Sequence, residues 1–474
     1  MVRIERCTRR DFLKGSSAVI AAMGVSSRVL GLSKEAQAGN GGPQMPPNIL
    51  FLFSDQQRWD TVGCYGQSLP ITPNLDLMAS EGTKFDLAFT TQPVCGPARA
   101  CVQTGRYPTE TGNYRNGIPL PVGELTIADY LRKAGYEVGY IGKWHLAATG
   151  DRPVPPHLRG GYKDYWLGAD ALEHTSHGYD GHMFDADMKQ IDFKGYRVDC
   201  QTDFVLEYLR TRDQQKPFFL FVSYLEPHFQ NDHNHFEGPN GSKERFKNYE
   251  VPGDLRDLPG DWQEEFPDYL GCCWSIDQNI GRIRNELASL GLADNTLIVY
   301  TSDHGCHFRT RNGEYKRSCH ESSIRIPMIA YGPGFHGGKV INELVSLIDI
   351  APTILAAAGI EKPLYMRGQP LQDLVSGKTN NWRQEVFVQI SESQTGRAIR
   401  TKRWKYSVSI PDASKPSSNT YYEDFLYDLK NDPHEQVNLI KDSSYASIRK
   451  ELAEILKNSV RDVEGKEPEI LPAV

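Results

Sequence analysis

The stretch from Cys95 to Gly105 places a reactive side chain at the predicted start of a helix. Pro97 suits the first turn of that helix, and Gly105 is the residue type expected just beyond its C-terminal end. Arg99 adds a permanent positive charge one turn into the helix, where the free backbone N–H groups also attract anions. We therefore interpret Cys95 as a nucleophile beside an anion-binding site. The alternative is a buried structural thiol, which is how most cysteines behave.

Two pairs of polar residues carry the donor atoms of a metal site. Asp55 with Gln56, and Asp303 with His304, each follow a short apolar run directly. Two carboxylates and an amide oxygen suit a hard cation such as Ca²⁺ or Mg²⁺, and the imidazole also admits Mn²⁺ or Zn²⁺. A single Asp after a strand is more often a helix cap or a turn former. Two such pairs after two buried strands favour a metal site.

Further charged and titratable residues predict a cationic pocket. Lys143 and His145 follow a third apolar run, and His228 follows a fourth, where it is a candidate proton donor. Lys316 lies a few residues beyond the second metal pair. Each of these residues alone is more often a solvated surface group. Together with Arg99 they would hold an anion in an otherwise acidic protein.

The apolar runs predict how these residues are brought together. Short runs rich in Val, Ile and Phe and bounded by turn residues are typical of strands buried on both faces, here 48–54, 138–141, 218–223 and 297–301. Helical spacing follows in 124–134 and in 275–290. Alternating strands and helices predict an α/β fold with a large, mostly parallel sheet between helices. All four polar groups would then meet at the carboxyl edge of that sheet.

Two long segments look like loops, and the last part of the chain looks like a separate unit. Residues 151–200 and 229–268 are rich in Gly, Pro, His and aromatic residues, which predicts an insertion over the sheet. We predict that His182 in the first of these segments contacts substrate. Tyr165, Trp166 and Tyr179 could stack on a sugar ring, although loop aromatics more often pin the loop itself.

The predicted organisation has three parts: a leader at 1–38, a catalytic domain at 39–375 and a C-terminal subdomain at 376–474. In the third part, short strands within 385–428 and a final helix at about 445–460 predict a small α+β unit.

The first 38 residues resemble a twin-arginine export signal. Arg9 and Arg10 precede a weakly apolar stretch that ends in a small-residue cleavage motif at Ala38. Without this leader the chain has 46 basic and 57 acidic residues, a formal charge of −11. That balance argues against nucleic acid or an anionic membrane as a partner. The sequence has no run of eighteen apolar residues, so we predict no membrane-spanning helix and no stable membrane insertion.

The motifs together resemble the formylglycine-dependent sulfatases of the alkaline-phosphatase superfamily. The matching features run in order along nearly the whole chain beyond the leader, namely Pro47-Asn48-Ile49-Leu50, Cys95-Gly96-Pro97-Ala98-Arg99, Gly142-Lys143-Trp144-His145, Ser302-Asp303-His304-Gly305 and Leu426-Tyr427-Asp428-Leu429. Many family members have Asp at position 56 and Asn or Gln at position 304. Gln56 and His304 are found in other branches. The family fold is a large mixed sheet between helices plus a small C-terminal sheet, in agreement with the expectation above.

The resemblance implies that Cys95 is converted to formylglycine. One hydroxyl of the hydrated aldehyde, bound to a metal, would attack the sulfur of a sulfate ester and give a covalent sulfate–enzyme intermediate. The family's metal is Ca²⁺, with Mg²⁺ or Mn²⁺ as alternatives. By resemblance its ligands are the modified Cys95 together with Asp55, Gln56, Asp303 and His304.

The resemblance also assigns the remaining roles. Arg99 and Lys143 would steady the nucleophile and the sulfate, and His145 would be the base that releases the product. His228 and Lys316 lie where the family binds the ester oxygen and protonates the leaving group.

The resemblance further implies partners and a location. A formylglycine-generating or sulfatase-maturating enzyme would modify the unfolded chain, and the twin-arginine translocase would then export the folded protein to the periplasm or beyond. The predicted substrate is a sulfated sugar or glycan. Three alternatives remain open at this stage: a phosphonate or phosphate ester hydrolase of the same superfamily, a hydrolase of small aryl or alkyl sulfates, and an inactive carbohydrate-binding relative in which Cys95 stays a thiol.

Overall fold

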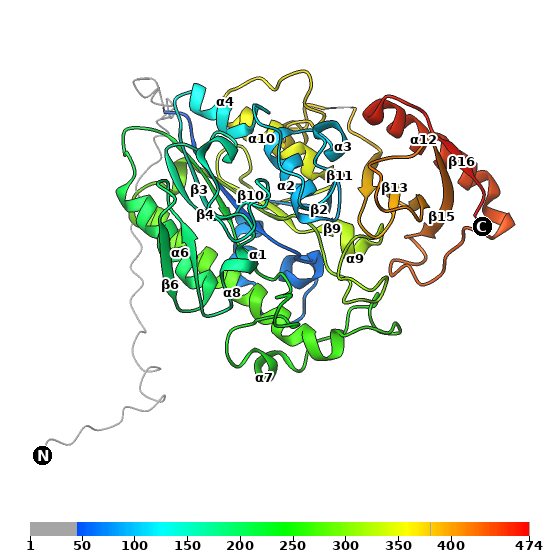
Figure 1. Ribbon diagram of the computed structural model, residues 1–474, viewed down its shortest axis with the longest axis horizontal. Helices are drawn as coiled ribbons and strands as arrows, with labels where there is room; N and C mark the ends of the chain where they lie inside the picture. Colours follow the sequence, from blue (N-terminus) through cyan, green and yellow to red (C-terminus); the bar gives the residue numbers. More distant parts are fainter. Residues whose placement is uncertain (1–44, 380, 474) are drawn as a thin grey trace, which may run out of the picture. The chain divides into compact units, whose positions relative to one another are not determined.

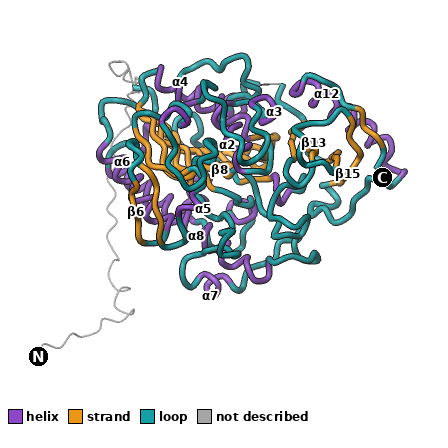
Figure 2. Tube along the Cα trace, viewed as in Figure 1, coloured by secondary structure: helices purple, strands orange, loops and turns teal. Residues whose placement is uncertain are grey.

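The computed structural model describes residues 45–379 and 381–473 and shows two sheets of unequal size (Figures 1 and 2). The predicted leader at 1–38 lies outside the described residues. In the described part of the chain no helix combines the length and the apolar character needed to cross a bilayer.

The larger sheet has eleven strands and is mixed, with a parallel centre. Its order is β11-β2-β10-β8-β1-β7-β3-β4-β5-β6, and β9 pairs with β2. The block β8-β1-β7-β3-β4 is parallel throughout, whereas β10, β5 and β6 run antiparallel to their neighbours. The strands are β1 (Asn48–Ser54), β2 (Thr83–Phe89), β3 (Glu137–Lys143), β4 (Tyr165–Ala169), β5 (Asp180–Phe184), β6 (Gln190–Lys194), β7 (Phe218–Ser223), β8 (Thr296–Ser302), β9 (Arg325–Ile326), β10 (Met328–Tyr331) and β11 (Lys339–Ser346).

Side chains alternate along β1 between two hydrophobic layers, because successive residues of a strand point to opposite faces. Phe51 and Phe53 join the core beneath α2 (Cys95–Thr104), α4 (Ile127–Lys133) and α10 (Ile350–Ala357). Leu50 and Leu52 join the core beneath α1 (Pro73–Glu81), α6 (Arg197–Thr211) and α8 (Trp262–Ser289). Residues 49–53 are wholly buried. Burial on both faces explains why the sequence shows continuous apolar runs and not alternation.

Twelve α-helices are defined within the described residues. They are α1 (Pro73–Glu81), α2 (Cys95–Thr104), α3 (Pro108–Thr111), α4 (Ile127–Lys133), α5 (Leu172–Thr175), α6 (Arg197–Thr211), α7 (Ser242–Phe246), α8 (Trp262–Ser289), α9 (Glu321–Ile324), α10 (Ile350–Ala357), α11 (Leu371–Val375) and α12 (Ala446–Glu464). Short 3₁₀ turns fall at 59–61, 63–65, 156–158, 293–295, 347–349 and 443–445.

The expected insertion at 151–200 is wrong in part. The strands β4, β5 and β6 in this segment extend the large sheet at one edge and do not form a loop over it. The two outer strands are short and half-exposed, and β6 alternates polar and apolar residues, so a search for continuous apolar runs misses them. Trp166 is 3% exposed and packs in the core, so it is not available to stack on a sugar.

The second expected loop, at 229–268, is also shorter than predicted. Helix α8 begins at Trp262, thirteen residues before the expected start, and continues through Pro267. Proline normally ends or kinks a helix in its interior, which is why the sequence indicates a later start.

The C-terminal sheet confirms the predicted α+β subdomain within the fold class. Its order is β12-β13-β14-β15-β16, with antiparallel pairs except for β15 with β16, which run parallel. The strands are β12 (Glu385–Ile390), β13 (Thr395–Thr401), β14 (Trp404–Ile410), β15 (Thr420–Asp428) and β16 (Glu469–Leu471). Leu452, Leu456 and Val460 of α12 pack on this sheet.

A buried ion-pair network joins this sheet to the catalytic part. Lys405 on β14 is wholly buried and pairs with Glu321 at 2.8 Å and with Glu435 at 2.5 Å. Arg400 on β13 also pairs with Glu321. Glu321 opens α9, five residues after Lys316, so the network anchors the chain segment next to a predicted site residue.

Replacing Lys405 with methionine should destabilise the protein by about 3–5 kcal/mol, because it leaves two buried carboxylates without their shared cation. Urea unfolding followed by circular dichroism measures the change. Lys402→Met is the matched control, since Lys402 is 54% exposed and its ion pair is long, at 3.9 Å. Equal stability of the two variants would contradict this role of the network.

Candidate active site

Helix α2 begins at Cys95 itself, as the sequence predicts, and it ends at Gly105, whose φ of 65° provides the left-handed cap. The whole helix is buried. Gly96 donates its N–H to Asn116 Oδ1 at 2.9 Å, and a Cβ at position 96 would come within 3.0 Å of that oxygen. The glycine therefore permits a close approach between the helix start and the loop that carries Asn116.

The four polar groups predicted to meet do so at neighbouring strands. Strands β8, β1, β7 and β3 are adjacent and parallel, so their carboxyl ends share one edge of the sheet. Asp55 follows β1 and Asp303 follows β8, with Ser54 opposite Ser302 in register. Lys143 is the last residue of β3. Parallel register thus converts four distant segments into one site.

Cys95 lies at the centre of a buried set of potential metal ligands. One donor atom each of Asp55, Cys95, Asp303 and His304 lies within 4.8 Å of the others. The Cys95 sulfur is 3.4 Å from Asp55 Oδ1 and 3.3 Å from His304 Nε2. None of the four is more than 1% exposed.

The atoms left free in this set fit a metal cation. Asp303 Oδ1 accepts the backbone N–H groups of Gln56 and His304, while its buried Oδ2 makes no hydrogen bond. His304 Nδ1 faces the carbonyl of Gly305 at 2.9 Å, so its Nε2 carries the lone pair that points at Cys95. Gln56 has a positive φ of 70°, a strained conformation typical of functional sites. An oxygen-rich set with one imidazole suits a divalent cation.

Three cations surround Cys95 and Asp55. Lys143 Nζ is 2.9 Å and Arg99 Nη2 is 3.0 Å from Asp55 Oδ2. Lys316 Nζ reaches the Cys95 sulfur at 3.0 Å and Gln56 Oε1 at 3.2 Å. The sequence prediction of a cationic pocket around Cys95 is therefore matched by the geometry.

This charge arrangement shifts the pKa values of the central acids in opposite directions. Burial alone would raise the pKa of Cys95, but Lys143 and Lys316 hold it well below its usual value. Burial would also raise the pKa of Asp55, but the positive charges of Lys143 and Arg99 outweigh it and the pKa is lowered. At Asp303 burial and the neighbouring Asp55 charge win, and its pKa rises to about 7. In the absence of a metal, the site thus resists holding both carboxylates charged.

The three predicted histidines occupy different places. His228 Nε2 lies 3.2 Å from Lys316 Nζ, and burial, then Lys316, lowers the pKa of His228. His145 contributes to the lowered pKa of Cys95, and its buried Nδ1 has no hydrogen-bond partner. His182 lies on β5, the strand next to the edge strand β6, with its ring against Phe184. Among its contacts in the described residues none is with the Cys95 cluster, and its substrate contact stays a prediction.

Glu173 is a site residue that the sequence does not reveal. Its Oε1 pairs at 3.1 Å with Lys143 Nζ, which also pairs with Asp55, and its buried Oε2 makes no hydrogen bond. Burial would raise the pKa of Glu173, but Lys143, His228 and His145 lower it to about 2. Gln230 holds the Glu173 backbone by donating from Nε2 to its carbonyl at 2.9 Å. A lone Glu in a predicted loop carries no pattern that could have found it.

Replacing Glu173 with glutamine should lower kcat/KM about 10- to 100-fold, because partners that orient the residues around a metal site typically contribute that much. The amide keeps the shape but removes the charge that fixes the Lys143 ammonium. Steady-state kinetics measures the loss, and Glu244→Gln, at a residue 82% exposed on α7, is the control. An unchanged kcat/KM in Glu173→Gln would rule out this positioning role.

The fold and this centre define a hydrolase suited to an anionic ester, and comparison with known proteins specifies which. The family model described as Sulfatase matches residues 47–360, and a second, described as N-sulphoglucosamine sulphohydrolase, C-terminal, matches residues 313–462. The chain belongs to the sulfatase family and is a sulfatase. The motif resemblance found in the sequence is confirmed.

The relatives match over most of their length. An N-acetylglucosamine-6-O-sulfatase of Bacteroides thetaiotaomicron is 27% identical and is matched over 97% of this chain and 95% of its own. An ulvan-active sulfatase of Formosa agariphila is 29% identical over 86% of this chain and 79% of its own. A structure solved with its substrate D-glucosamine-2-N,6-O-disulfate is 26% identical, covers 90% of this chain and 99% of its own, and has a TM-score of 0.74.

Proposed function

We propose that this sulfatase removes sulfate from a sulfated sugar or glycan, with formylglycine made from Cys95 as its nucleophile and Ca²⁺ as its metal. The observation that carries the proposal is the buried Asp55-Cys95-Asp303-His304 set with three cations on its flank. When present, the metal would supply Lewis acidity and neutralise negative charge. The hydrated aldehyde would supply an oxygen nucleophile in place of the sulfur.

The positions of the other site residues support a separate role for each of them. Arg99 and Lys143 lie on the Asp55 side, where they would hold sulfate oxygens and balance charge. Lys316 and His228 form a pair whose Nζ–Nε2 contact supports proton delivery to the departing alcohol oxygen. His145 contributes to the lowered pKa of Cys95 and has a buried nitrogen without a hydrogen-bond partner, which supports its role as the base that regenerates the aldehyde.

The activities for which the relatives are named support a sugar substrate. One is named for N-acetylglucosamine 6-O-sulfate, one for ulvan, and one structure holds a sulfated glucosamine. The decisive experiment compares kcat/KM on sulfated monosaccharides and oligosaccharides, an aryl sulfate and an aryl phosphonate. The proposal requires the sulfated sugars to be the best substrates. A preference for the phosphonate would overturn sulfate ester hydrolysis, and a preference for the aryl sulfate would overturn the sugar assignment.

We also propose export through the twin-arginine translocase to the periplasm or beyond, after a maturating enzyme has modified Cys95. Arg9 and Arg10 in the leader motif support this route. Cell fractionation of the host should find the protein outside the cytoplasm. Replacing both arginines with lysine should retain it in the cytoplasm, and export of that variant would contradict the route.

A further inference from the structure

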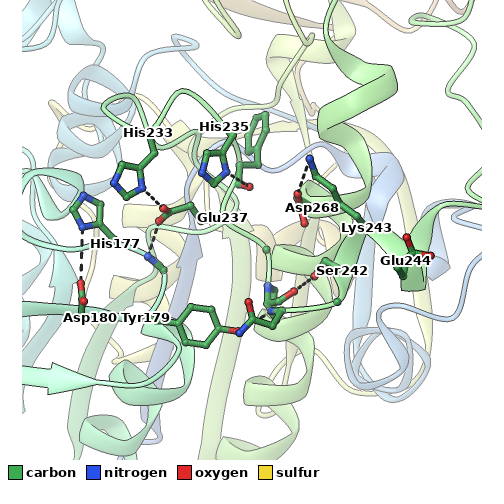
Figure 3. A pocket seen from close by; sticks show the side chains of 16 residues that line it. His177, Tyr179, Asp180, His233, His235, Glu237, Ser242, Lys243, Glu244 and Asp268 are labelled. Atoms are coloured by element: carbon green, nitrogen blue, oxygen red, sulfur yellow. Dashed lines mark hydrogen bonds and ion pairs between the residues drawn. The ribbon is translucent and has the colours of Figure 1, made fainter.

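A second group of potential metal ligands lies apart from the Cys95 cluster. It borders a pocket of about 570 Å³ between the segment after α5 and the segment after β7 (Figure 3). The group combines imidazoles with carboxylates: His177, His233, His235, Asp180, Asp232 and Glu237. Figure 3 shows His177 and His233 on opposing segments, with Glu237 between them and His235.

Each of the three rings has one nitrogen already engaged. His177 Nε2 is 2.8 Å from Asp232 Oδ2, and His233 Nδ1 is 2.5 Å from Glu237 Oε1. His235 Nδ1 lies 3.0 Å from the backbone carbonyl of the next residue. A ring that donates one N–H in this way presents a lone pair at its other nitrogen. Metal-bound histidines almost always have this arrangement.

The rings are also stacked, which brings them to one place. His177 and His233 lie with centroids 4.0 Å apart and planes 10° apart, and His233 lies 5.9 Å from His235 at 12°. Two protonated rings at that separation would repel. One donor atom each of His177, Asp232 and His233 lies within 4.8 Å of the others, and the same holds for His233, His235 and Glu237. His233 is shared by both sets.

Acidic side chains outnumber the lysine in the lining of this pocket. Three carboxylates face three imidazoles, and the lysine of the pocket, Lys243, is 3.6 Å from a different carboxylate, Asp268. Imidazole and carboxylate donors together suit Zn²⁺ and neighbouring divalent metals better than Ca²⁺. We propose that His177 and His233 bind a Zn²⁺-type ion, with Asp232 and Glu237 orienting their rings and His235 completing the site.

Such an ion would fix the position of two segments that lie close to the active site. Asp232, which holds the His177 ring, accepts from Gln230 Nε2 at 2.8 Å, and the same Nε2 donates to the Glu173 carbonyl at 2.9 Å. Glu173 in turn pairs with Lys143. The metal would therefore tie the segment after α5 to the segment after β7 close to the catalytic cations, without contacting the Cys95 cluster.

Isothermal titration of the full chain with ZnCl₂, under saturating Ca²⁺, tests the site. We expect one Zn²⁺ bound in the wild type and at least about tenfold weaker binding in His233→Ala and in His177→Ala. His157→Ala is the matched control, because His157 is an exposed histidine elsewhere on the surface, and it should bind as the wild type does.

A second arm separates this site from the catalytic centre. The same titration in Cys95→Ala, which lacks the thiol of the buried cluster, should still show the His233-dependent ion, and Zn²⁺ should raise the melting temperature of that variant. Equal binding by wild type and His233→Ala, or loss of the ion in Cys95→Ala alone, would overturn the proposal. Neither measurement depends on turnover. The zinc site can therefore be confirmed or rejected even if the proposed sulfatase chemistry is wrong.

Discussion

Cys95→Ala should abolish sulfate ester hydrolysis, with kcat reduced by at least about 10⁴-fold, while the protein stays folded. The side chain lies at the meeting point of Asp55, His304 and Lys316, at distances of 3.4, 3.3 and 3.0 Å. Every group of the site is directed at this position, so no neighbour can replace the nucleophile. Steady-state rates on a sulfated sugar measure the loss of hydrolysis, and circular dichroism shows whether the variant stays folded.

Cys101 provides the matched control on the same helix. It is wholly buried, and burial raises the pKa of its thiol to about 12, so it is an inert structural cysteine. Cys101→Ala should keep its activity and lose only stability. Mass analysis of the peptide that contains Cys95, from protein made in its native host, should show an aldehyde. Full activity with an unmodified thiol would refute the formylglycine part of the proposal.

Asp303→Asn should cost about 10³-fold in activity and yet not weaken the metal-free fold. The amide can still accept the two backbone N–H groups that Asp303 Oδ1 accepts, but it removes the charge that a cation needs. Loss of a bound metal removes several kcal/mol of transition-state stabilisation. Calcium should therefore raise the melting temperature of the wild type but not that of Asp303→Asn.

The stability of the metal-free protein should depend on pH in a direction that the pKa of Asp303 determines. Burial, then Asp55, raises the pKa of Asp303 from 3.8 to about 7. The folded metal-free protein then binds more protons than the unfolded chain between these values, so its stability should fall as pH rises from about 4 to 7. Asp303→Asn should lack this fall, and Ca²⁺ should suppress it in the wild type. A flat metal-free profile in the wild type would contradict the carboxylate repulsion inferred here.

The sequence predicts the parallel centre of the sheet well because those strands are buried on both faces. The run at 48–54 coincides with β1, and the run at 218–223 coincides with β7. The sequence does not predict the outer strands β5 and β6, because both are short and half-exposed and the polar–apolar alternation of β6 resembles a polar loop. The central strands are therefore enough to predict the fold class from the sequence. They are not enough to predict how many strands the sheet has.

The site residues fall into two groups, those that the sequence can predict and those that it cannot, for a physical reason. Asp55 and Asp303 come together because each directly follows a strand, so strand pairing alone determines their separation. Glu173 reaches the site from a short helix in a segment with no periodic pattern, through its ion pair with Lys143. Only tertiary packing determines such a position, so it cannot be predicted from the spacing of residues in the sequence.

The ion-pair network around Lys405 means that the smaller sheet is not a detachable module. The turn after β12 also contacts the catalytic part, where Ser391 accepts from Gln92 and Ser393 donates to the carbonyl of Arg317, next to Lys316. A chain truncated before β12 would therefore lose part of the support for its own catalytic lysine. By contrast, a single protease cut between α11 and β12 should leave two fragments that stay associated and retain turnover.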